Sequence, residues 1–186
     1  MATVALQQVT SRFARDNAGK TLEKPVSLKF IKKFLTPEVI ARLESKCPDG
    51  KVFIWGAKLE RSHQFQKMLP RRCLVLFRRG SAVYKCGVML EWVMNPELAE
   101  YLWGFDADGE TWGLVYFLKS ARDISIAATE VNRLIGRVPN DHWQGLVAVS
   151  PPAADAVIQF VKSKVDEIRS NRDVQPAQAG AANAKS

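Results

Sequence analysis

Three short apolar runs, each bounded by turn residues, constrain the fold of this chain more than any other feature of its sequence. They lie at residues 52–55, 73–77 and 82–93. The first run is rich in β-branched and aromatic residues and stops at Gly56, which is typical of a buried strand followed by a tight turn. Residues 58–69 are expected to form a loop or short helix, and the turn at 78–81 joins the other two runs. The stretch predicts a strand, a helical crossover and a β-hairpin.

The residues before this stretch fall into two parts. Residues 1–26 lack sustained periodicity and predict a flexible basic arm; the alternative is an arm laid along a phosphate backbone. Its basic residues are Arg12, Arg15, Lys20 and Lys24. Residues 27–47 carry apolar residues at helical spacing, and Thr36-Pro37 predicts a capping residue followed by the first residue of a helix.

The residues after it predict further strands and a C-terminal helix. Two apolar runs, at 112–118 and 143–149, indicate later strands, and residues 151–172 carry one apolar stripe. Residues 173–186 hold Val174 as their only large apolar residue, which predicts a disordered tail or linker. With 48–150 as the central domain, we expect an α+β chain: a small, closed or nearly closed β-barrel of five to six strands with peripheral helices.

The central domain resembles a known group of folds. A strand ending in Trp55, a short helical segment, the run Leu74–Phe77, a strand with Gly87 in its middle and the run Trp112–Leu118 are together similar to EVE and YTH domains. These belong to the PUA-like β-barrels, which bind nucleic acid. EVE-type chains often place Gly-Asp before the second of these strands, where this chain has Arg71-Arg72-Cys73. The resemblance covers roughly residues 48–150.

The resemblance implies a function. It implies a non-catalytic module that recognises a modified base, expected to be methylated, flipped out of double-stranded DNA into an aromatic cage. It also implies the DNA specificity component of a modification-dependent restriction system, acting beside a nuclease or motor protein. Two alternatives stay open: an RNA-binding PUA-like accessory protein, and a protein-interaction module whose basic surface meets an acidic partner.

Composition restricts the partners. Lysine and arginine number 27 against 19 acidic residues, a net charge of +8 that favours a polyanion. No apolar run approaches membrane-spanning length and no signal peptide opens the chain, so we expect a soluble, cytoplasmic protein that does not bind membranes. Three cysteines without a CxxC pair, and two histidines, predict reduced thiols and no zinc.

The sequence offers little for catalysis. Asp106, Asp108 and Glu110 could present oxygens to calcium, but the twelve-residue ligand pattern fails after them. No glycine-rich phosphate loop and no activated nucleophile motif is present. We therefore expect no metal, no cofactor and no enzymatic activity.

Aromatic residues are the candidates for base binding, because stacking one base on an aromatic face contributes roughly 1 to 3 kcal/mol. By resemblance, Trp55 is the first wall of the cage and Trp112 or Tyr116 the second, with Trp103 as a third. The backbone groups of Gly56 and Ala57 would recognise the base edge. The alternative for each aromatic residue is ordinary packing in the core.

Basic residues around the first two apolar runs are the candidates for phosphate binding. The alternative is a solvated charged surface. The candidates are Arg61, Lys67, Arg71, Arg72, Arg78 and Arg79.

Overall fold

The structure is a computed structural model that describes residues 2–68 and 72–174. Short 3-10 helices are labelled η. The elements in chain order are β1 (Thr3–Gln8), α1 (Arg12–Thr21), β2 (Val26–Ser27), α2 (Leu28–Ile31), η1 (Lys32–Phe34), α3 (Pro37–Lys46), β3 (Lys51–Ala57), η2 (Leu59–Arg61), α4 (Ser62–Phe65), β4 (Cys73–Arg79), β5 (Ala82–Met94), α5 (Pro96–Trp103), β6 (Leu114–Leu118), β7 (Arg122–Ala127), α6 (Ala128–Leu134), β8 (Leu146–Val149) and α7 (Ala153–Val174).

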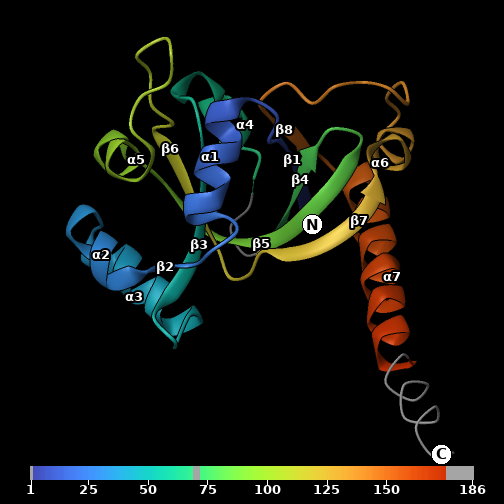
Figure 1. The fold of residues 1–186 in the computed structure, drawn as a ribbon, viewed down its shortest axis with the longest axis horizontal. Coiled ribbons are helices and arrows are strands. Elements are labelled where there is room, and N and C mark those ends of the chain that lie inside the picture. The colour runs from blue at the N-terminus through green and yellow to red at the C-terminus, as the bar shows by residue number, and fades with distance from the viewer. Residues whose placement is uncertain (1, 69–71, 175–186) are drawn as a thin grey trace, which may run out of the picture.

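The strands form one curved, mixed sheet in the order β2-β3-β6-β5-β4-β1-β8, with β7 beside β5 (Figure 1). The long strand β5 pairs with β4 and β7 through its first half and with β6 through its second half. The α+β class is confirmed. The expected closed or nearly closed barrel of five to six strands is wrong, because eight strands are described and the sheet stays open between β3 and β8.

The segment after β3 spans this opening. Gln64 on α4 reaches β8, where its Oε1 atom accepts a hydrogen bond from the backbone N–H of Ala148 at 3.1 Å. Phe65, on the same short helix, is fully buried in the core. A side chain thus takes the place of a neighbouring strand at this part of the β8 edge, which would otherwise leave a backbone donor without a partner.

The N-terminal residues are part of the sheet. Strand β1 lies between β4, to which it is parallel, and β8, to which it is antiparallel. Val4, Ala5 and Leu6 have no exposed surface. The prediction of a flexible arm over residues 1–26 is therefore wrong. A strand buried on both faces shows no alternation of apolar and polar residues, so periodicity could not reveal it.

Three buried clusters hold the fold together. The inner core lies on the concave face and includes Ala5, Trp55, Val75 and Tyr116. The outer core lies on the other face of β1 and β4, where helices α6 and α7 cover it (Figure 1). A third cluster packs α2, α3 and α5 against β3 and β6. Alternation along β1 and β4 sends neighbouring residues into the inner and outer cores in turn.

The strand, helical crossover and hairpin predicted from the three apolar runs agree with the structure. The runs at 52–55, 73–77 and 82–93 lie in β3, β4 and β5, and β4 pairs with β5 as a hairpin. The helical segment predicted over 27–47 contains α2, η1 and α3. Thr36 caps α3 by accepting from the Val39 N–H, as its position before Pro37 predicts.

The C-terminal part contains the predicted helix, and α7 covers most of 151–172. The expected tail at 173–186 lies outside the described residues from 175 onward. All three cysteines are buried and unpaired. Burial raises the pKa of the Cys73 and Cys86 thiols to about 11. Among the described helices, none has both the length and the hydropathy that crossing a bilayer requires.

Candidate nucleic-acid interface

A cavity of about 390 Å³ opens where the end of β1 and the start of β8 meet the end of β3. We call it the α1 pocket, because the N-terminus of α1 forms one side. The end of β1, the end of β3 and the start of β8 form the rest. Its lining residues are Gln7, Gln8, Thr10, Ser11, Ala14, Gly56, Ala57, Lys58, Glu60, Arg61, Trp112, Gly145 and Leu146.

Gly56 gives the pocket its shape on the β3 side. A Cβ atom at this position would lie 2.6 and 2.8 Å from the Trp103 ring and 3.0 Å from the Leu114 carbonyl oxygen. Only glycine therefore lets the Trp103 ring lie flat against the β3 backbone. Beyond Val52 and Lys51, which pair with β2, the second edge of β3 is not paired with another described strand. Gly56 and Ala57, at the end of this strand, line the pocket.

The aromatic residues form a packed cluster beside the pocket. The Trp112 ring lies 4.9 Å from that of Trp55, 5.5 Å from that of Trp103 and 5.2 Å from that of Phe13, measured between centroids. Trp55 also meets Phe77 edge to face at 5.9 Å. Most of these contacts have the edge-to-face or tilted geometry that aromatic rings favour. The cluster holds Trp112 in a fixed orientation at the pocket wall.

The structure brings together three of the six predicted base-binding residues. Trp112, Gly56 and Ala57 line the α1 pocket. Trp55 and Tyr116 are fully buried and Trp103 is 4% exposed, and none of the three lines the pocket. Trp55 and Trp103 lie against Trp112, whereas Tyr116 packs against Phe65 in the inner core. The described pocket thus has one aromatic wall.

The polar side of the pocket comes from residues that sequence reasoning missed. Gln7 is 5% exposed, and its Oε1 atom accepts a hydrogen bond from the Tyr116 hydroxyl at 3.4 Å. Ser11 caps α1 by accepting from the Ala14 N–H, and Gln8 donates to Thr10. All lie in the segment expected to be a flexible arm. The pair Thr10-Ser11 directly after an apolar run was the available signal, since serine is a favoured helix cap.

The predicted phosphate-binding residues are scattered. Arg61 lines the α1 pocket. Lys67 is exposed after α4, Arg71 lies outside the described residues, and Arg72 lies at the far end of β4. Arg79 pairs with Glu23 at 2.9 Å and lies over the Tyr84 ring. Of the five that the structure describes, only Arg61 lines the pocket.

The prediction for Arg78 is wrong, because this side chain is structural. It is 5% exposed, and its guanidinium donates to the carbonyl oxygens of Gly80 and Asp141 at 2.7 and 2.6 Å. It also lies over the Trp143 ring. Burial lowers the pKa of Arg78 from its usual value.

Two arginines of the former arm are neighbours in sequence of residues that line the pocket. Arg12 and Arg15 are exposed on the first turns of α1, directly after the lining residue Ser11. Residues three apart on a helix share a face. Arg61 lines the pocket but lies 3.4 Å from Glu60, which also lines it, and Arg12 lies 3.9 Å from Asp16. The N-terminal end of the helix adds positive charge beside the pocket.

The acidic turn considered for calcium has another role. The Nζ atom of Lys58 lies 2.9 Å from Asp106, 3.8 Å from Asp108 and 2.5 Å from Glu110. Hydrogen bonds to Glu110 and Asp106 raise the pKa of Lys58 well above its usual value. The hydrogen bond from Lys58 lowers the pKa of Asp106. The ion pairs between these carboxylates and Lys58 fix the turn at 106–110 to the end of β3. This end of the strand lies beside the opening of the pocket.

Comparison with known proteins adds one finding. No family model matches the sequence, and no curated protein matches it. Its structure, however, is similar to a solved one. The chain shares its fold with the N-terminal domain of Thermococcus gammatolerans McrB bound to m5C DNA. The two share 19% of their residues, with a TM-score of 0.66, over 87% of this chain and 98% of the McrB domain.

The extent of this match matters. A coverage of 87% is more than residues 48–150 alone could supply, so elements outside the segment that resembles EVE and YTH domains belong to the shared fold. Sequence identity this low shows a common fold with the McrB domain.

Proposed function

We propose that this chain is a non-catalytic reader of a modified base in double-stranded DNA, and that the α1 pocket receives the base after it flips out of the duplex. The observation that carries the proposal is the coincidence of one aromatic wall, an unpaired strand edge and flanking arginines around a single cavity. That the McrB domain of like fold is bound to m5C DNA supports it. Recognition of a methylated base is part of the proposal.

The base would stack on Trp112. Stacking on one aromatic face contributes roughly 1 to 3 kcal/mol, whereas extruding a base from a duplex costs a few kcal/mol. One wall therefore offsets only part of the cost, unlike the two walls expected from the sequence. Hydrogen bonds and phosphate contacts must supply the remainder. The packing of Trp112 by Phe13, Trp55 and Trp103 means that no ordering of the ring has to follow binding.

The base edge would meet polar groups and the methyl group apolar ones. The unpaired edge of β3 at Gly56 and Ala57 offers backbone donors and acceptors, and Gln7 offers a side-chain amide. Ala14, Ala57 and Leu146 are almost fully buried and provide the apolar lining. One extra methyl group in a close-fitting apolar pocket is worth roughly 1 to 3 kcal/mol.

Phosphate contacts would come from Arg12, Arg15 and Arg61. Such contacts position the duplex and make affinity salt-dependent without carrying sequence information. A role as the DNA specificity component of a modification-dependent restriction system, beside a nuclease, belongs to the same proposal and rests on the resemblance to EVE and YTH domains.

The decisive experiment measures binding of the full chain by fluorescence anisotropy. The probes are matched duplexes with no modification, 6-methyladenine, 5-methylcytosine or 5-hydroxymethylcytosine, and a single-stranded RNA. We expect one modified duplex to bind about tenfold more tightly than the unmodified one. Trp112→Ala should abolish this preference and Trp112→Phe should keep part of it, because phenylalanine retains an aromatic face.

Two arginine variants distinguish a phosphate contact at the pocket from a general effect of positive charge. Arg61→Ala should weaken binding of every duplex alike and lower the slope of log affinity against log salt by about 1. Arg72→Ala removes the same charge at the far end of β4 and should change neither. Equal binding of all duplexes, or a preference that survives Trp112→Ala in a folded protein, contradicts the proposal. Tightest binding of the RNA would favour the RNA-binding alternative.

A further inference from the structure

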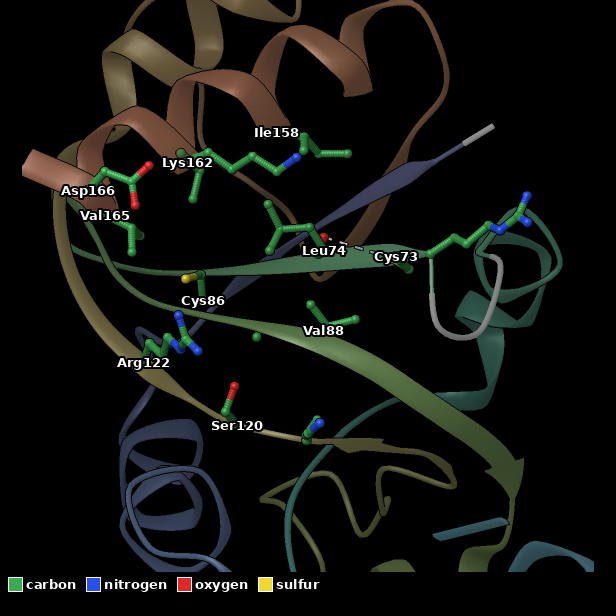
Figure 2. A pocket seen from close by; sticks show the side chains of 14 residues that line it. Cys73, Leu74, Cys86, Val88, Ser120, Arg122, Ile158, Lys162, Val165 and Asp166 are labelled. Carbon is green, nitrogen blue, oxygen red and sulfur yellow. Dashed lines mark hydrogen bonds between the residues drawn. The ribbon is translucent and has the colours of Figure 1, made fainter. Parts of the chain in front are cut away.

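A second and larger cavity, of about 610 Å³, lies between α7 and the outer face of the sheet. We call it the α7 groove. Figure 2 shows Ile158, Lys162 and Val165 on α7 facing Leu74, Cys86 and Val88 on β4 and β5, with Arg122 and Ser120 farther down the sheet. The start of α7 packs into the outer core through Ala154 and Val157, whereas its later turns help to enclose the groove.

The walls of the groove are aliphatic on both sides. Val161 is almost fully buried, Leu74, Ile158 and Val165 are partly buried, and Val88 is 41% exposed. The groove therefore continues the outer core outward to solvent. When an apolar group covers such a surface, water is displaced, and this stabilises the complex by roughly 25 cal/mol per Å² of apolar area buried.

Four basic side chains surround this apolar surface. They are Arg72, Lys119, Arg122 and Lys162, and all are exposed. None of them forms an ion pair within residues 2–68 and 72–174. Elsewhere Lys58, Arg79 and Arg137 each meet a carboxylate. The groove thus combines an apolar floor with a rim of four basic side chains, which form no ion pair in the described chain, and one acidic side chain, Asp166.

We propose that the α7 groove binds an amphipathic helix with acidic flanks from a partner protein. Apolar residues at i, i+3 or i+4 and i+7 would fill the groove, and glutamate or aspartate beside them would pair with the rim. A DNA backbone fits less well, because phosphates offer nothing to the aliphatic walls. The chain's own residues 175–186 hold no acidic residue and no large apolar one, so they lack the required chemistry.

The position of the groove allows both sites to be occupied together. Arg72 and Leu74 lie at the start of β4, whereas Gln7 and Gln8 of the α1 pocket lie at the end of the parallel strand β1. The register pairs Thr3 with Cys73 and Gln8 with Arg78, so the two sites are separated by about 16 Å along the strands. They also lie on opposite faces of the sheet. The inference stands apart from the proposed reading of DNA.

The test uses the full chain and three synthetic helical peptides of equal length. The first has leucines along one face and glutamates beside them, the second replaces the glutamates by lysines, and the third scrambles the first. Fluorescence anisotropy should show saturable binding of the glutamate peptide alone. Chemical-shift mapping with the isotope-labelled chain should place it on Leu74, Val88 and Val165.

Substitutions in the α7 groove test whether the peptide binds there. Val88→Asp, and the pair Arg122→Glu with Lys162→Glu, should each weaken binding of the glutamate peptide at least about tenfold. Lys29→Glu, an exposed charge reversal on α2, should leave it unchanged. The same groove variants should bind the preferred DNA duplex as the unaltered chain does, which separates this proposal from the first.

Four outcomes overturn the proposal. These are absence of saturable binding, equal binding of the scrambled peptide, shifts that map outside the groove, and displacement of the peptide by DNA. Light scattering supplies a further check. A dimer that Val88→Asp converts to a monomer would show that a second copy of this chain covers the groove.

Discussion

The most constrained position of the α1 pocket is a residue without a side chain. Gly56 brings the Trp103 ring against β3, and Trp103 in turn supports Trp112 at the pocket wall. The Trp103 ring is also fixed by its Nε1 atom, which donates to the Thr21 hydroxyl at 3.0 Å. The ring therefore cannot move away without breaking a buried hydrogen bond.

Two alanine substitutions test this constraint. Gly56→Ala should lower the free energy of unfolding by about 1 to 3 kcal/mol, because the new methyl group collides with a fixed ring and a backbone oxygen. Gly19→Ala, inside α1 where nothing lies within 4 Å of the new atom, should raise it by about 0.4 to 1 kcal/mol. Denaturant unfolding measures both. Equal stability of the two variants would show that the Trp103 ring moves to make room for the new methyl group.

At the residue scale, the sequence indicates the chemical type of a side chain better than it indicates how deeply that side chain is buried. Arg78 and Arg79 look alike as neighbouring bases before a turn, yet strand alternation sends them to opposite faces of β4. Arg78 lies over the Trp143 ring and Arg79 over the Tyr84 ring. The choice between Trp55 and Trp112 as pocket wall likewise depended on packing from α1, which residue types alone do not show.

Among the elements, the turn at 106–110 depends on one lysine for its position. Lys58 lowers the pKa of Asp106, so the pair contributes stability that is present above the ordinary aspartate pKa of about 3.9. This contribution is lost as the pH falls through the lowered pKa of the folded state. The position of the turn beside the pocket mouth is therefore sensitive to acid.

The variant Lys58→Met tests how this contribution to stability depends on pH. Between pH 6 and 8, a range in which Asp106 is fully ionised, the variant should be less stable than the unaltered chain. The difference should shrink as the pH falls below about 4. Thermal unfolding across pH measures it, with the exposed Lys29→Met as control. A difference as large at pH 3 as at pH 7 would mean that the aliphatic part of Lys58 acts through packing.

Elements with a strong local pattern were predictable, and elements defined by distant partners were not. The β4–β5 hairpin follows from two apolar runs around a glycine turn, and α3 follows from Thr36-Pro37. Strand β1 has six residues and is recognisable only by its pairing with β4 and β8. The opening between β3 and β8 is spanned by Gln64, whose contact with β8 lies across the molecule.

For the whole molecule, β1 is indispensable. We expect deletion of residues 1–10 to abolish cooperative thermal unfolding, because it removes four fully buried residues and the partner of both β4 and β8. Circular dichroism measures the transition. Deletion of residues 175–186, which contain no large apolar residue, should leave it unchanged. A cooperative transition at the original temperature after the N-terminal deletion would contradict this role for β1.

The meeting of β1 with β8 also sets the order in which the molecule can be completed during synthesis. Val4, in the first of the described strands, leaves the ribosome before the other strands, and Val149, its partner, follows only after them. Leu146 pairs with Gln7 in the β1–β8 ladder, and both line the α1 pocket together with Gln8 and Gly145. A nascent chain therefore carries neither a finished sheet nor a finished pocket, and it acquires both in the same late step.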